Sequence, residues 1–79
     1  MIIYDYSKLL GKIIEKFGNK SNFASKMKLS ERTISLKLNN KVEFKQKEIV
    51  NACELLDIPI EQMYIYFFME REFKDIEQN

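Results

Sequence analysis

The stretch that decides the fold lies at residues 20–41 and reads KSNFASKMKLSERTISLKLNNK. Asn19 can cap a first short helix, and Ser30 can cap a second helix that runs to about Asn39, because their side-chain oxygens accept bonds from free backbone amides. Apolar side chains recur at helical spacing through the stretch: Phe23, Ala24, Met27, Leu29, Ile34 and Leu38. The pattern predicts two short helices that depend on neighbouring elements for their stability.

The spacing within this pair is informative about how the two helices cross. The small side chain of Ala24 allows a close approach, Leu29 fills the corner of the turn, and Ile34 anchors the second helix from below. This is the arrangement of a helix-turn-helix, which leaves the outer face of the second helix free to enter a major groove.

At this point the sequence resembles a known family, the lambda-repressor/Cro-like helix-turn-helix proteins. The resemblance rests on LSERTIS at residues 29–35 and NNK at residues 39–41, and it extends over about residues 5–68. ACELLDIP at residues 52–59 and YFF at residues 66–68 are similar to small phage Cro-like proteins. The resemblance implies a phage transcriptional regulator that occupies operator DNA as a homodimer.

The chain departs from this family pattern at three positions. The family usually has glycine where Lys28 and Asp57 stand, and glutamine is common where Lys20 stands. If the turn keeps its left-handed residue, lysine at position 28 costs about 1 kcal/mol. None of these changes breaks the motif.

The rest of the chain predicts three further helices. One spans about residues 5–18, another spans about residues 45–56, and a fifth begins after Pro59. The buried stripe expected for the first helix consists of Tyr6, Leu9, Leu10, Ile13, Ile14 and Phe17. The inward residues expected after Pro59 are Ile60, Met63 and Tyr64. The predicted fold class is mainly α, a five-helix domain of the Cro/repressor type.

The two ends of the chain leave alternatives open. Residues 2–4 and 64–69 are rich in β-branched and aromatic side chains, so they can pair as a short terminal β element. Alternatively, the fifth helix continues through Phe67, Phe73 and Ile76. We expect a DNA-binding domain at residues 1–68 and a charged tail at residues 69–79 with a frayed end.

Charge is sorted along the chain, although the formal net charge is only +1. Residues 1–17 carry a net charge of +1, residues 18–47 carry +6, and residues 48–79 carry −6. A basic middle and an acidic end suit a polyanion-binding face opposite a face that stays clear of the polyanion. Lysines that merely keep a small domain soluble are the alternative explanation.

Composition excludes several classes of protein. There is no histidine and one cysteine, which argues against a Cys/His zinc site, a disulfide framework and any imidazole-dependent triad. No apolar run reaches the ~18 residues of a membrane span, and no signal segment is visible. We therefore expect a cytoplasmic protein that is not an enzyme and uses no cofactor, metal or membrane. Cys53 is expected to be a small buried hydrophobe.

The resemblance and the helical pattern together predict the roles of individual residues. The predicted base contacts are Arg32, Ser35, Glu31 and Leu36. The predicted DNA-backbone contacts are Lys20, Ser30, Lys37, Asn39, Asn40, Lys41 and Lys45. The predicted dimerisation residues are Tyr64, Tyr66, Phe67 and Phe68. Arginine near the start of a recognition helix suits guanine, whereas an acid there also simply complements the helix dipole.

One rival class remains open beside the DNA-binding regulator. A protein-interaction module, such as an antitoxin or antirepressor, can use the same fold and bind a protein partner. An enzyme is disfavoured because no nucleophile–base pair is visible, and a ligand sensor is disfavoured because no length remains for a second domain.

Overall fold

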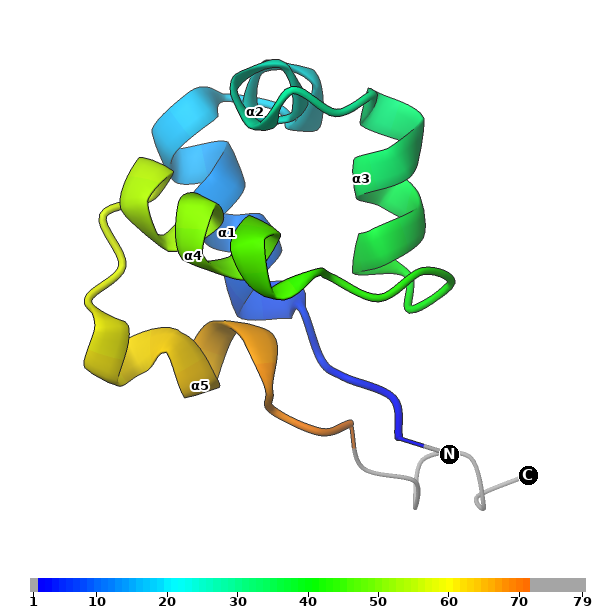
Figure 1. The fold of residues 1–79 in the computed structure, drawn as a ribbon, viewed down its shortest axis with the longest axis vertical. Helices are drawn as coiled ribbons and strands as arrows, with labels where there is room; N and C mark the ends of the chain where they lie inside the picture. Colours follow the sequence, from blue (N-terminus) through cyan, green and yellow to red (C-terminus); the bar gives the residue numbers. More distant parts are fainter. Residues whose placement is uncertain (1, 72–79) are drawn as a thin grey trace.

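A computed structural model describes residues 2–71 of the chain. Its elements, in chain order, are α1 (Ser7–Phe17), α2 (Lys20–Met27), α3 (Glu31–Leu38), α4 (Gln46–Leu55), the 3-10 turn η1 (Ile60–Gln62) and α5 (Met63–Phe67). Figure 1 shows α2 at the top, α3 upright beside it, α1 and α4 in the centre and α5 at the bottom. The predicted mainly helical, five-helix architecture is confirmed.

The helix ends follow from local chemistry. Gly18 has a φ of 86° and its amide bonds to Ile14, which ends α1. The side chain of Asn19 accepts from the amide of Asn22 at 2.8 Å and begins α2. The hydroxyl of Ser30 accepts from the amide of Thr33 at 3.0 Å and begins α3. These side chains satisfy amides that a helix start leaves without an intrahelical partner.

Three residues other than glycine adopt a positive φ in the described part of the chain: Lys28 at 61°, Asn40 at 62° and Asp57 at 57°. Lys28 and Asp57 stand where the resembling family usually has glycine, so the left-handed conformation is kept without glycine's freedom. Asp57 also pairs with Lys16 at 2.6 Å, and this bond lowers the pKa of the Asp57 carboxyl. Asparagine tolerates this region better than lysine does.

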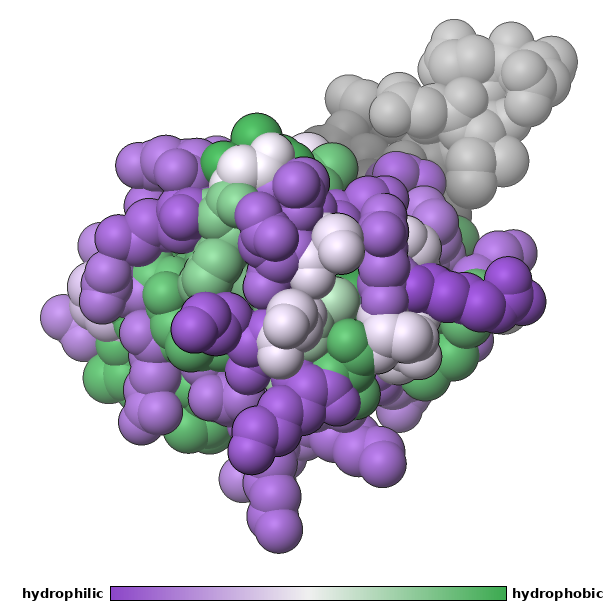
Figure 2. Space-filling view, turned by 90° about the horizontal axis from the view of Figure 1, so that it is seen from above, coloured by the Kyte–Doolittle hydropathy of each residue, from purple (hydrophilic) through white to green (hydrophobic). Residues whose placement is uncertain are grey.

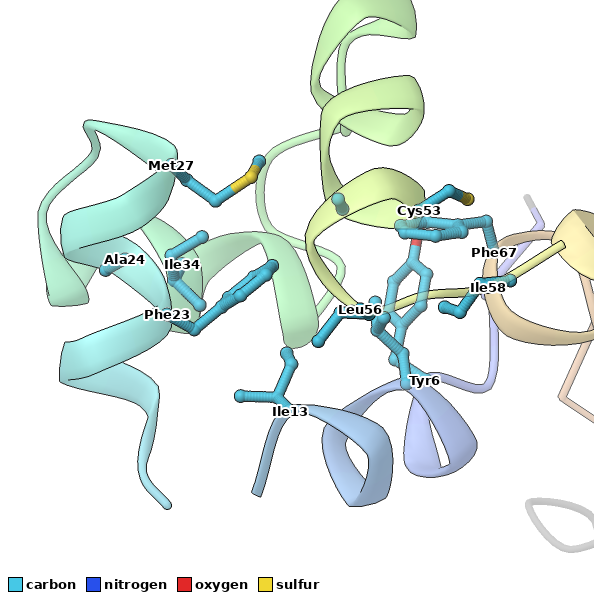
Figure 3. Packing of buried hydrophobic residues seen from close by; sticks show 12 residues of the cluster. Tyr6, Ile13, Phe23, Ala24, Met27, Ile34, Cys53, Leu56, Ile58 and Phe67 are labelled. Atoms are coloured by element: carbon cyan, nitrogen blue, oxygen red, sulfur yellow. The ribbon is translucent and has the colours of Figure 1, made fainter. Parts of the chain in front are cut away.

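The core lies where α1, α2, α4 and α5 converge (Figure 3). α1 packs on α2 and α5, and α2 packs on α3 and α4. The largest side chains that are fully buried are Phe23, Phe67, Leu9, Ile13, Ile34 and Leu56. Cys53 is buried as predicted, and this burial raises the pKa of its thiol. The helix pair α2–α3 therefore packs on the rest of the core through the buried side chains of α2 and through Ile34 of α3.

Four residues expected in the core are exposed instead. Leu10 is 38% exposed and Ile14 is 46% exposed, while Ile60 and Tyr64 reach 68% and 61%. Successive helical residues are rotated by about 100°, so Leu10 and Ile14 turn away from the line through Leu9 and Ile13. The sequence pattern therefore predicted a wider buried stripe on α1 than the structure has.

The chain ends combine the two alternatives. α5 covers Met63–Phe67, so of the two alternatives left open for these residues the structure has the helix. Within residues 2–71, β structure is limited to one antiparallel bridge between Tyr4 and Glu70. The further course of the tail, including Phe73 and Ile76, lies outside the described residues.

Candidate nucleic-acid and partner-binding face

The α2–α3 pair forms one end of the molecule. The two helices have eight residues each and are joined by the turn at residues 28–30. The amide of Leu29 bonds back to the carbonyl of Ala24 at 2.9 Å, which closes the turn. Figure 2 looks down on the α2 end, and the surface there is mainly hydrophilic. The predicted outer face of α3 is partly exposed, beginning with Glu31 and Arg32.

The first turn of α3 presents charge but uses its hydroxyls internally. Glu31 and Arg32 are exposed. Ser30, besides capping the helix, donates its hydroxyl hydrogen to Thr33 Oγ1 at 2.8 Å. The predicted phosphate contact of Ser30 would therefore compete with the helix cap.

Lys20, a predicted phosphate contact, and Ser35, a predicted base contact, lie side by side although they belong to different helices. The Nζ of Lys20 lies 3.2 Å from the hydroxyl oxygen of Ser35, and both residues are half-buried. The lysine begins α2 and the serine lies in the middle of α3, so the bond joins the two helices. Leu36 is half-buried next to Ser35. This bond fixes an ammonium group beside the exposed face of α3.

Lys37 contradicts the prediction that it contacts a DNA backbone. It is only 2% exposed, although it is a lysine on α3. Its Nζ donates to the carbonyl of Glu43 at 2.8 Å and pairs with Glu48 Oε1 at 2.9 Å. The same Nζ lies 5.8 Å from the ring centroid of Phe44. The loop after α3 folds back over the last turn of the helix. The Lys37 ammonium group is therefore buried against this loop and Glu48 and is not accessible to a phosphate.

Glu48 completes this buried ion pair. Its carboxylate also accepts from the amide of Lys45 at 2.8 Å and thereby begins α4. Burial by itself raises the pKa of Glu48, but the Lys45 amide and the Lys37 ammonium outweigh it and hold the pKa below its usual value. One carboxylate therefore joins the end of α3 to the start of α4.

Asn40, another predicted phosphate contact, uses its side chain within the chain. Its carboxamide nitrogen donates to the carbonyl of Tyr4, and its oxygen accepts from the Tyr4 amide, both at 2.9 Å. Asn39, Lys41 and Lys45 are exposed. Among the predicted phosphate contacts beyond α3, these three keep a side chain turned to solvent.

The predicted dimerisation residues are divided between surface and core. Phe67 is 2% exposed and packs edge-on against Phe44, with ring centroids 5.3 Å apart, so its predicted dimer contact is wrong. Phe68 is half-buried against Tyr4, and Tyr66 is also half-buried. Tyr64 is 61% exposed. The core of a single copy uses most of the aromatic end.

Sequence reasoning missed the residues that hold the end of α3. The acid at the third position of α4 was a readable helix-start signal for Glu48. No pattern indicated that Glu48 pairs with Lys37 or that Tyr4 meets Asn40. Within residues 2–71, no three His, Cys, Asp or Glu side chains come together as metal ligands. No helix of this part is long and apolar enough to cross a membrane.

Comparison with known proteins assigns the class of the chain. The structure defines a small, mainly helical domain in which the α2–turn–α3 end is exposed. The chain belongs to the family described as "Protein of unknown function (DUF739)", whose pattern it matches over residues 2–70. No curated protein matches it.

One solved structure is similar over most of its length. It is the solution structure of the modulator of repression (MOR) of the temperate bacteriophage TP901-1 from Lactococcus lactis. The two chains share 55% sequence identity over 82% of this chain and 88% of that chain, with a TM-score of 0.73. That relative is a regulatory protein. The narrower resemblance to lambda-repressor and Cro proteins stays a prediction.

Proposed function

We propose that this protein is a phage regulator that modulates repression by binding a repressor protein. The observation that carries the proposal is the 55% identity, over 82% of the chain, with a phage modulator of repression. The proposal corresponds to the protein-interaction alternative, of the antirepressor type, and gives it priority over direct operator occupancy. The protein performs no bond chemistry in this role and acts by changing what the repressor can bind.

The exposed surface supports a protein contact. Arginine and tyrosine are enriched among the residues that dominate protein–protein binding energy. Arg32 is exposed on α3, and Tyr64 is 61% exposed on α5. Arg32 lies in a hydrophilic setting with Glu31 beside it, which suits a charged partner surface. Ile60, four positions before Tyr64 in the sequence, is 68% exposed, and two exposed apolar side chains suit an apolar partner surface.

The test is a direct mixture of this protein with the repressor encoded by the same phage. We expect both proteins to co-elute in size-exclusion chromatography at about 10 µM, which requires a Kd in the micromolar range or tighter. Separate elution at every ratio, with both proteins folded, would overturn the proposal. An unrelated helix-turn-helix repressor serves as the specificity control.

A second candidate is sequence-specific binding of double-stranded operator DNA as a homodimer. It is favoured by exposed Arg32 on α3, by the ammonium group that Ser35 holds, and by exposed Lys41 and Lys45. In this role Arg32, Ser35, Glu31 and Leu36 face the bases, and residues 1–68 form the binding domain in the cytoplasm. Tyr64 and Tyr66 then contribute the dimer contact in place of the buried Phe67.

Selection of genomic DNA fragments at two salt concentrations tests this second candidate. An enriched inverted repeat with half-sites about 34 Å apart supports it. With about six phosphates neutralised per dimer, the slope of log affinity against log salt is expected near −5. Binding without sequence preference, or no binding, would leave only the protein-partner role.

A further inference from the structure

The inference concerns Asn40, which follows α3 and has a φ of 62°. Its carboxamide makes two hydrogen bonds to one peptide unit of the chain, to the amide and the carbonyl of Tyr4, 36 positions away in sequence. A strand neighbour normally supplies such a donor and acceptor together. Here one side chain takes the place of a strand.

The opposite edge of the same N-terminal segment is also bonded. The amide of Asp5 donates to the carbonyl of Met69 at 2.7 Å, and the amide of Arg71 donates to the carbonyl of Ile3 at 2.8 Å. Successive residues of an extended chain direct their backbone groups to opposite edges. Residues 3–5 therefore lie between the Asn40 side chain on one edge and residues 69–71 on the other. Figure 1 shows the N-terminal segment beside the chain that follows α5.

Aromatic packing reinforces this three-part arrangement. The Tyr4 ring meets Phe68 edge-on, with centroids 6.1 Å apart, and also lies 6.1 Å from the ring of Tyr6. Tyr4 thus contacts the chain that follows α5 through its side chain and the end of α3 through its backbone. α3 packs on α2 and through Leu38 on the core, and these polar contacts and Lys37 add to what holds its far end.

We propose that Asn40 is a positioning residue that couples the end of α3 to the C-terminal segment 69–71 through residues 3–5. A partner that holds either surface then restrains the other. The residue type is demanding: glycine adopts a positive φ but has no side chain, and aspartate can accept from Tyr4 but cannot donate to it. The coupling deepens the proposed function, because that function supplies the repressor as the partner that would hold one of the two surfaces. The coupling itself can be measured in the protein without a partner.

The test is amide hydrogen exchange of the full chain, followed by NMR, in Asn40→Gly. Glycine keeps the positive φ without strain, so the change removes only the two side-chain bonds. We expect exchange to rise at least about tenfold at Tyr4 and also at Asp5 and Arg71, which Asn40 does not touch. The amide of Leu56, bonded to Ala52 in the core, serves as the internal reference.

The matched control is Asn39→Gly, the same change at the preceding, exposed position. It is expected to leave exchange at Asp5 and Arg71 within about twofold of the wild-type protein. If Asn40→Gly raises exchange at Tyr4 alone, the segments are not coupled and the proposal fails. Asn40→Asp, which keeps the acceptor, repeats the test if the glycine variant is too unstable. Repressor binding is measured separately, so the two proposals can fail independently.

Discussion

The two ends of α3 differ in how they use their polar side chains. At the first turn, Glu31 and Arg32 are exposed. At the last turn, Lys37 is buried in an ion pair with Glu48, and just after the helix Asn40 bonds to Tyr4. One end of the helix is free to meet another molecule, and the other end holds the helix in place. A helix of eight residues thus combines a binding surface with its own support.

The largest expected effect is on stability at the supporting end. Lys37→Ala leaves the Glu48 carboxylate without its partner, and breaking a buried pair in this way costs about 3 kcal/mol. Urea unfolding should show this loss, whereas Arg32→Ala should change stability by no more than about 0.5 kcal/mol. An equal loss in the free energy of unfolding in the two variants would show that the two ends of α3 do not differ in their contribution to stability.

Binding should respond in the opposite order. Arg32→Ala is expected to weaken binding of the phage repressor at least about tenfold, or about 1.4 kcal/mol, because exposed arginines often dominate an interface. Lys26→Ala removes the same charge from an exposed position on α2 and is the matched control, with a change below about threefold. Calorimetric titration gives both values. Equal losses in the two variants would indicate unspecific charge attraction.

The turn before α3 should yield a smaller, stabilising change. Lys28→Gly relieves a φ of 61° and is expected to raise stability by about 1 kcal/mol. In a domain of this size, this corresponds to about 4–8 °C in Tm. Lys26→Gly, in the last turn of α2, should lower the Tm instead. A lower Tm in Lys28→Gly would show that the lysine side chain contributes a contact worth more than the strain.

The smallest expected effect is on the free energy of unfolding at acidic pH. The pKa of Glu48 is lower in the folded chain than in the unfolded chain, so the unfolded state binds more protons as the pH falls. The contribution of Glu48 is therefore complete above its ordinary value of about 4.5 and is lost as the pH falls towards the folded pKa. Glu48→Gln should flatten this part of the curve, measured by urea unfolding at several pH values. An unchanged acid limb would mean that other carboxylates account for it.

Local signals made most of the fold predictable. Asn19, Ser30 and Gly18 act on neighbouring amides, so helix ends could be read from the residues nearby. Ile34 is fully buried and Cys53 nearly so, as helical spacing indicated. The choice between strand and helix at the aromatic end stayed open, because local propensity does not describe long-range contacts such as the packing of Phe67 against Phe44.

The candidate site was less predictable for the same reason. Lys37 and Lys41 look equivalent in sequence, yet one is buried and the other exposed. The difference arises because the loop through Phe44 covers the last turn of α3, which depends on packing between distant segments. Asn40 has a positive φ, which asparagine tolerates, but its bonds to Tyr4 span 36 positions. Long-range bonds of this kind have no periodic signature.

The most direct test of the central claim is the binding of the phage repressor to its operator, measured by fluorescence anisotropy with and without this protein. We predict that adding the wild-type protein shifts the operator affinity of the repressor in a concentration-dependent way, and that Arg32→Ala largely abolishes the shift. An unchanged repressor affinity, together with specific binding of the operator by this protein alone, would contradict the account and establish direct operator occupancy in its place.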